Sequence, residues 1–277
     1  MSRVALGGSG FSIGETQDEA AAVDTIRTAY DHGVRQFDSA RAYATVDDPL
    51  HNETLFRRAL TGRDDAVIGT KGGHFRVGRD TWGVDGSPAA LRRDCENSLT
   101  ALGVDALPLY YLHKADPDVP LAESVGALNE LRTEGKIVDV GVCNVSAEQL
   151  AQALAVTPIA VVQNKFSPYQ AGDRSVLDAA EAAGLRFFAY SPLGGKKDRG
   201  RLPELMPDTV ALAGELGVSF QRLVLAWLLA QSPALTVISG ARRAVTATDS
   251  AAAGDVELDE ASAARITAEA AAVSSTT

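Results

Sequence analysis

Cysteine and long apolar runs are scarce in this sequence of 277 residues. The two cysteines, Cys95 and Cys143, cannot build a disulfide framework, and they have no metal-ligand spacing, so we expect no metal site. No apolar leader segment precedes the first strand-like residues. The longest apolar run, Leu223–Ala230, is far shorter than the ~20 residues that span a bilayer. We therefore expect a reduced, cytoplasmic protein with no membrane partner.

Positive charge is also scarce, since 26 Lys and Arg residues face 36 Asp and Glu residues and the net charge is −10. Nucleic acids and anionic membranes need a positive protein surface, so the composition argues against both as partners. A phosphorylated small molecule needs only a local basic cluster and stays possible. We expect a monomer or a weak oligomer that acts on a small molecule.

Short apolar runs alternate with amphipathic helical segments along the whole chain. Strands are expected at residues 4–6, 34–37, 66–70, 107–112, 137–142, 159–162, 185–189 and 235–238. This alternation is typical of α/β proteins with parallel strands. Eight such units fit a (β/α)8 TIM barrel, as a single domain over residues 1–277, better than a doubly wound sheet.

Local signals mark several helix starts and loops. Capping boxes are expected at residues 16–19 and 146–149, and Ser87-Pro88 predicts a further helix start. The Gly-rich stretches at residues 72–86 and 194–197 are expected to be loops, as are residues 7–10 after the first strand.

Three predicted strands stop at ionisable side chains, namely Asp38, Lys71 and His113. If these strands are neighbours, they lie ~4.8 Å apart and their ends meet at one edge. Tyr43, in the loop after Asp38, then lies just above them. An acid, an ammonium, an imidazole and a phenol at one rim indicate a proton-transfer site. The remaining strand ends also carry polar or aromatic groups: Asn144, Gln163, Tyr190 and Arg242.

The sequence resembles the aldo-keto reductase family over nearly its whole length. The matching pieces, in order, are Phe37-Asp38 with Tyr43, Gly69-Thr70-Lys71, Tyr111-Leu112-His113, Gly141-Val142-Cys143-Asn144, Val162-Gln163, Ala189-Tyr190-Ser191-Pro192-Leu193-Gly194 and Ile238-Ser239-Gly240-Ala241-Arg242. The resemblance implies a (β/α)8 barrel that transfers a hydride between NADP(H) and a carbonyl or alcohol substrate.

The resemblance also implies a role for each ionisable residue. Tyr43 would be the general acid for carbonyl reduction, and His113 would orient the carbonyl oxygen. A free phenol has a pKa of ~10, and a nearby ammonium favours the phenolate. We therefore expect Lys71 to lower the pKa of Tyr43 and Asp38 to hold Lys71 in place.

The cofactor would be bound by residues that follow the later strands. The resemblance implies contacts from Asn144, Gln163, Tyr190, Ser191, Leu193, Gly194, Ser239, Gly240, Arg242, Arg243 and Asp249. The paired arginines suit an adenosine 2′-phosphate and favour NADPH over NADH. The family pattern continues to an arginine, an acidic residue and an asparagine. This chain has Thr246, Asp249 and Ser250 there, which weakens the expected NADPH preference.

Two alternatives stay open at this point. Lys71 at a barrel strand end could form a Schiff base, as in a class I aldolase. The chain could also be a non-catalytic subunit or sensor that binds NADPH. The sequence defines the substrate pocket less sharply than the catalytic residues. The candidate pocket residues are Phe11, His74, Trp82 and Tyr169.

Overall fold

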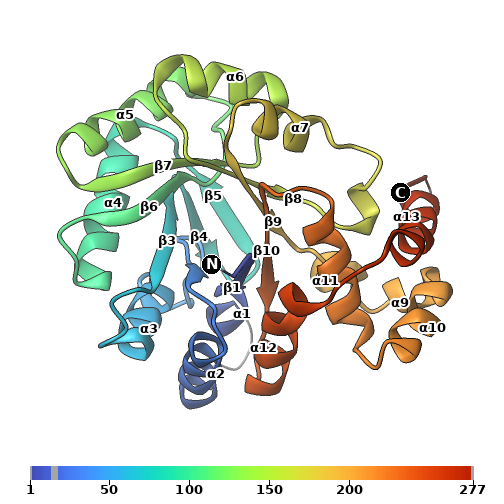
Figure 1. Ribbon diagram of the computed structural model, residues 1–277. Helices are drawn as coiled ribbons and strands as arrows, with labels where there is room; N and C mark the ends of the chain where they lie inside the picture. The colour runs from blue at the N-terminus through green and yellow to red at the C-terminus, as the bar shows by residue number, and fades with distance from the viewer. Residues whose placement is uncertain (1, 14–17, 276–277) are drawn as a thin grey trace.

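Eight parallel strands close into a barrel in this computed structural model, which describes residues 2–13 and 18–275 (Figure 1). Around the barrel the strands are β1 (Val4–Gly7), β2 (Gln36–Asp38), β3 (Val67–Gly72), β6 (Leu107–Leu112), β7 (Ile137–Cys143), β8 (Val161–Lys165), β9 (Arg186–Tyr190) and β10 (Leu235–Gly240). Strand β10 pairs with β1 and closes the ring. The predicted (β/α)8 barrel is confirmed.

Helices surround the barrel and connect its strands (Figure 1). The longer ones are α2 (Glu19–Asp31), α3 (His51–Leu60), α4 (Pro88–Leu102), α5 (Leu121–Thr133), α6 (Ala147–Val156), α7 (Ser175–Ala182), α10 (Pro207–Glu215), α11 (Phe220–Ala230), α12 (Ala244–Ala251) and α13 (Glu260–Ser275). The short ones are α1 (Ser9–Ser12), η1 (Pro168–Gln170), α8 (Gly195–Asp198), α9 (Leu202–Leu205) and η2 (Ala252–Asp255).

Side-chain caps fix the starts of several helices. The hydroxyl of Ser87 accepts a hydrogen bond from the backbone N–H of Ala90, with Pro88 in the first turn of α4. Ser146 and Gln149 form the predicted capping box of α6. The other predicted box begins at Thr16, which lies outside the described residues. The described N-cap of α2 is Asp18, whose carboxylate accepts from the N–H of Ala21.

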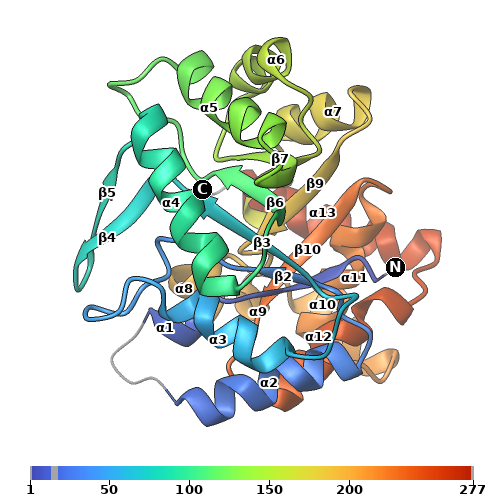
Figure 2. The ribbon, with the colours of Figure 1, turned by 90° about the vertical axis from the view of Figure 1, so that its left-hand side faces the viewer.

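Three predicted loops contain regular structure instead. Residues 72–86 contain an antiparallel hairpin of β4 (His74–Gly78) and β5 (Thr81–Val84), which stands out from the barrel in Figure 2. Its glycines serve packing, since a Cβ at Gly83 would lie 2.7 Å from the ring of Phe75 across the hairpin. Residues 195–198 and 9–12 form the single helical turns of α8 and α1, where loops at residues 194–197 and 7–10 were predicted.

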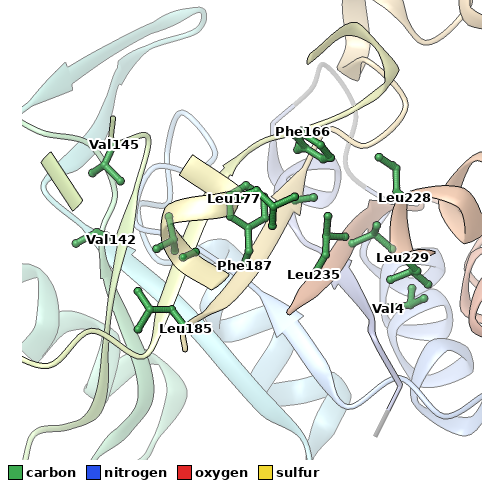
Figure 3. Close-up of a cluster of buried hydrophobic side chains, with 14 of the residues drawn as sticks. Val4, Val142, Val145, Phe166, Leu177, Leu185, Phe187, Leu228, Leu229 and Leu235 are labelled. Atoms are coloured by element: carbon green, nitrogen blue, oxygen red, sulfur yellow. The ribbon is translucent and has the colours of Figure 1, made fainter. Parts of the chain in front are cut away.

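The largest apolar cluster fills the space between the barrel and its helices. Figure 3 shows part of it, where Leu177 of α7 lies against Phe187 of β9. A smaller cluster fills the barrel interior and includes Leu109, Tyr111 and Phe188. This packing supports the carboxyl ends of the strands, where the polar residues gather.

Among the described residues, no single helix is both long enough and apolar enough to cross a membrane. Only α10 and α11 taken together pass on length and composition, and they are bent by 100° relative to each other.

Candidate active site

An ion pair between Asp38 and Lys71 forms the centre of the site. Strands β2 and β3 are neighbours, and Nζ of Lys71 lies 2.7 Å from Oδ1 of Asp38. The same ammonium donates to the backbone carbonyl of Ser39 at 2.8 Å and to the hydroxyl of Tyr43 at 3.4 Å. The side chain of Lys71 is fully buried, so these oxygens replace the water that an ammonium otherwise requires.

The Asp38 carboxylate has a further donor that we did not expect. Nε2 of Gln163 donates to Oδ1 of Asp38 at 2.7 Å, and Gln163 lies within β8 rather than after it. The strand runs from Val161 to Lys165 instead of the predicted 159–162. The amide of Gln163 is therefore buried beside the carboxylate of Asp38 and is not exposed at the open end of the barrel.

The hydroxyl of Tyr43 lies over this ion pair, 3.4 Å from Nζ of Lys71 and 3.5 Å from Oδ2 of Asp38. We expected the ammonium to lower the pKa of Tyr43, and the structure contradicts this. Removal of the phenol from water raises the pKa of Tyr43 well above its usual value of 10, and the charge of Asp38 raises it further. The positive charge of Lys71 is largely neutralised by the carboxylate that it contacts.

His113 directly follows β6, which is the next strand after β3 in the barrel. Its ring lies edge-on to the ring of Tyr43, with 5.9 Å between the centroids. Burial lowers the pKa of His113 well below 6.5, and the charge of Lys71 acts in the same direction. The imidazole is therefore neutral at neutral pH and can donate one hydrogen bond. The structure thus brings all four predicted ionisable residues together.

A second group of polar side chains lies at the ends of β7 and β9. Asn144 has a left-handed backbone with φ of 58°, and its Nδ2 donates to the carbonyl of His113 at 2.9 Å. The hydroxyl of Tyr190 donates to Oδ1 of Asn144 at 2.6 Å. Asn144 is exposed and Tyr190 is half-buried, so both are accessible from the open end of the barrel. Burial raises the pKa of Tyr190 to about 12.

The turn after β9 has an unusual backbone. Ser191, Gly194 and Gly195 all have positive φ values, of 51°, 90° and 79°. Leu193 in the same turn is half-buried. A Cβ added at Gly194 would lie 2.6 Å from the ring of Tyr169, which packs beneath the turn. These contacts explain why glycine occupies position 194.

The substitution Gly194→Ala is expected to lower the free energy of unfolding by about 1–3 kcal/mol. Alanine disfavours the positive φ of this position, and its added methyl group would clash with the ring of Tyr169. Denaturant unfolding would measure the change. Gly214→Ala is the matched control, since no atom lies near its Cβ position and it sits within α10, where alanine is the better helix former. Equal stability of the two variants would contradict the account of this turn.

The predicted cofactor residues at and after the end of β10 differ in their exposure. Gly240, Arg242 and Arg243 are exposed, whereas Ser239 is buried with its hydroxyl 2.8 Å from that of Ser250. The carboxylate of Asp249 is already engaged within the protein: it accepts from Arg222 at 2.8 Å and from Ser219 at 2.6 Å.

The candidate pocket residues have different surroundings. Phe11 is buried against Phe56, and Tyr169 donates to the backbone carbonyl of Asp198. The indole of Trp82 donates to the carbonyl of Ala42 at 3.3 Å. Trp82 therefore anchors the loop of residues 39–50, which carries Tyr43 and is called the Tyr43 loop below. Of these four candidates, His74 is the one whose ring packs against an ionisable residue of the site, since its ring centroid lies 4.9 Å from that of His113. Within the described ranges, no three His, Cys, Asp or Glu side chains are grouped to hold a metal ion.

Comparison with known proteins decides the family. The sequence model of the aldo/keto reductase family matches residues 3–270. The chain belongs to the aldo/keto reductase family. It is similar to an aldo-keto reductase of Strobilurus tenacellus, with 31% identity over 92% of this chain and 82% of the relative.

The chain is also similar to two solved structures with the same fold. An aldo/keto reductase from Klebsiella pneumoniae, crystallised with NADP and acetate, matches with a TM-score of 0.80 and 29% identity, over 95% of this chain and 89% of that one. A glycerol dehydrogenase from Gluconobacter oxydans matches with a TM-score of 0.82 and 26% identity, over 98% and 92%. The chain is thus an oxidoreductase of the aldo/keto reductase family.

Proposed function

We propose that this aldo/keto reductase uses NADPH to reduce an aldehyde or a ketone to the alcohol, and that it also catalyses the reverse reaction with NADP+. The observation that carries the proposal is the hydroxyl of Tyr43, which lies within 3.5 Å of both Lys71 and Asp38. A phenol over a buried ion pair suits the delivery of a proton. The complex of the Klebsiella relative with NADP supports the choice of cofactor.

The residues at the open end of the barrel fit a dinucleotide. Tyr190 and Asn144 would contact the nicotinamide, because an aromatic face and an exposed amide suit that ring and its carboxamide. Gly194 and Gly195 carry no side chains, so the backbone of this turn could approach a pyrophosphate group closely. Arg242 and Arg243, both exposed, would contact phosphate groups. Ser191, Leu193, Gln163, Ser239, Gly240 and Asp249 would line the same path. Gln163 and Asp249 also have partners within the protein, namely Asp38 and Arg222.

Bound NADPH would supply the hydride, and this chain would control the proton. Tyr43 would donate its proton to the carbonyl oxygen as negative charge develops there. Lys71 would then stabilise the phenolate that remains, and Asp38 would keep Lys71 within reach of it. The neutral imidazole of His113 would donate a hydrogen bond that orients the carbonyl oxygen.

NADPH fluorescence titration tests the proposal first, followed by oxidation of bound NADPH with a panel of aldehydes and ketones. Tight binding with turnover is the expected result. Binding without turnover on any carbonyl would favour the non-catalytic subunit or sensor. Failure to bind either NADPH or NADH would overturn the reductase proposal.

The contacts of Lys71 weigh against the Schiff-base alternative. A Schiff base requires a free amine lone pair, whereas the ammonium of Lys71 lies in a buried ion pair and contacts three oxygens. Borohydride trapping of a carbonyl compound on Lys71 would instead support the Schiff-base aldolase.

The pH dependence of the two directions should differ. A raised pKa keeps Tyr43 protonated to higher pH, so the acid needed for reduction is not lost between pH 7 and 9. Alcohol oxidation needs the phenolate, whose population rises about tenfold per pH unit below the pKa. We expect the kcat/KM of reduction to stay level over this range and that of oxidation to rise. A tenfold fall in reduction by pH 9 would instead indicate a lowered pKa.

A further inference from the structure

One face of the β4–β5 hairpin is turned toward the proposed active site. His74 and Arg76 lie two residues apart on β4, and Arg76 is the cross-strand partner of Trp82 on β5. Alternate residues of a strand and directly paired residues share one face of a sheet. All three side chains therefore leave the hairpin on the same side.

Two of these side chains hold the backbone on either side of Tyr43. Nη1 of Arg76 donates to the carbonyl of Ala44 at 2.7 Å, and Nε1 of Trp82 donates to the carbonyl of Ala42 at 3.3 Å. Arg76 also donates to the carbonyl of Gly78 at 2.8 Å, so it joins the hairpin turn to the Tyr43 loop. Figure 2 shows the hairpin standing beside the loop that leads from β2 to α3.

The third side chain, His74, contacts His113, the residue proposed to orient the carbonyl oxygen. The rings of His74 and His113 meet edge to face, with 4.9 Å between the centroids. Burial lowers the pKa of His74, with a smaller effect from the charge of Lys114. The hairpin thus contacts both the backbone beside Tyr43 and the ring of His113.

The Tyr43 loop depends on such contacts. Residues 39–50 lie in neither helix nor strand. The hydroxyl of Tyr43 makes only long contacts, at 3.4 Å to Lys71 and 3.5 Å to Asp38, which hold the ring weakly. The position of the phenol therefore depends in part on the backbone of residues 42–44, whose carbonyl groups accept hydrogen bonds from Arg76 and Trp82.

We propose that the β4–β5 hairpin positions Tyr43 for proton transfer, with Arg76 and Trp82 as positioning residues. The inference rests on the proposed role of Tyr43 as the proton donor. A misplacement of about 1 Å can cost about 100-fold in rate even when the change lies away from the reacting atoms.

The first test is Arg76→Gln, which shortens the side chain and removes its reach to Ala44. We expect kcat for carbonyl reduction to fall about 10–100-fold, while KM and the Kd for NADPH change less than about threefold. Arg76→Lys keeps one long donor and should recover part of kcat. Val77→Thr is the control on the same strand, since Val77 is 66% exposed, and its kcat should match wild type.

A double-mutant cycle separates positioning from general loss of structure. In a Tyr43→Phe background there is no phenol left to position, so adding Arg76→Gln should lower kcat less than about twofold. A full additional loss in that background would show that Arg76 acts by another route and would overturn the proposal. So would wild-type kcat in the single variant Arg76→Gln.

Trp82→Phe provides an independent test if Arg76→Gln does not fold. It removes the indole N–H and keeps an aromatic ring, and kcat should fall several-fold with an unchanged Kd for NADPH. Wild-type kcat in this variant would overturn the proposed role of Trp82 as a positioning residue. Failure of the proposed function would give a different result. In that case the wild-type protein would show no turnover of carbonyl compounds, or the Tyr43→Phe variant would retain wild-type turnover.

Discussion

Tyr43→Phe is expected to lower kcat for carbonyl reduction by about 10²–10⁴-fold, the usual contribution of a positioned general acid. The change removes a single oxygen and keeps the ring beside His113, so the Kd for NADPH should change less than about twofold. Single-turnover reduction measured with saturating NADPH would report the chemical step directly.

Tyr30→Phe is the matched control for this substitution. Tyr30 lies on α2, and its hydroxyl donates to Asp65 at the surface and not to a residue of the site. The same atom is lost there, but kcat should stay within about twofold of wild type. Near-normal kcat in Tyr43→Phe would mean that another group donates the proton.

The grouping of the four ionisable residues was predictable because it depends on topology. Parallel strands in a barrel present their carboxyl ends at one rim, so Asp38, Lys71 and His113 had to meet once three neighbouring strands were assigned. Tyr43 follows Asp38 after only five residues and has little freedom to lie elsewhere.

The direction of the Tyr43 pKa shift was not predictable in the same way. The sign depends on whether the charge of Lys71 acts on the phenol or is neutralised first by Asp38. The 2.7 Å contact between Lys71 and Asp38 and the burial of the phenol decide this, and neither follows from spacing along the chain.

The hairpin was missed because its glycines read as loop signals. Phe75 and Gly83 are neighbours only after the strands pair, and the ring of Phe75 then occupies the space over Gly83. The hydrogen bonds from Gln163 to Asp38 and from Arg222 to Asp249 also join distant segments, so no local pattern predicts them.

Lys71→Met is expected to lower the free energy of unfolding by about 3–5 kcal/mol, because it leaves the Asp38 carboxylate buried without its charged partner. Only 5% of Asp38 is exposed, so water cannot replace the ammonium. Carbonyl reduction should also be lost by at least about 100-fold, since no cation remains to stabilise the phenolate.

The double variant Asp38→Asn with Lys71→Met separates these two effects. It removes both buried charges, so it should recover much of the stability and none of the activity. Arg265→Met is the control, because Arg265 and Glu215 form an exposed pair at 3.2 Å that should contribute less than about 1 kcal/mol. Denaturant unfolding measures all three variants. If Lys71→Met cost no more stability than Arg265→Met, the buried ion pair would not have the role that we assign to it.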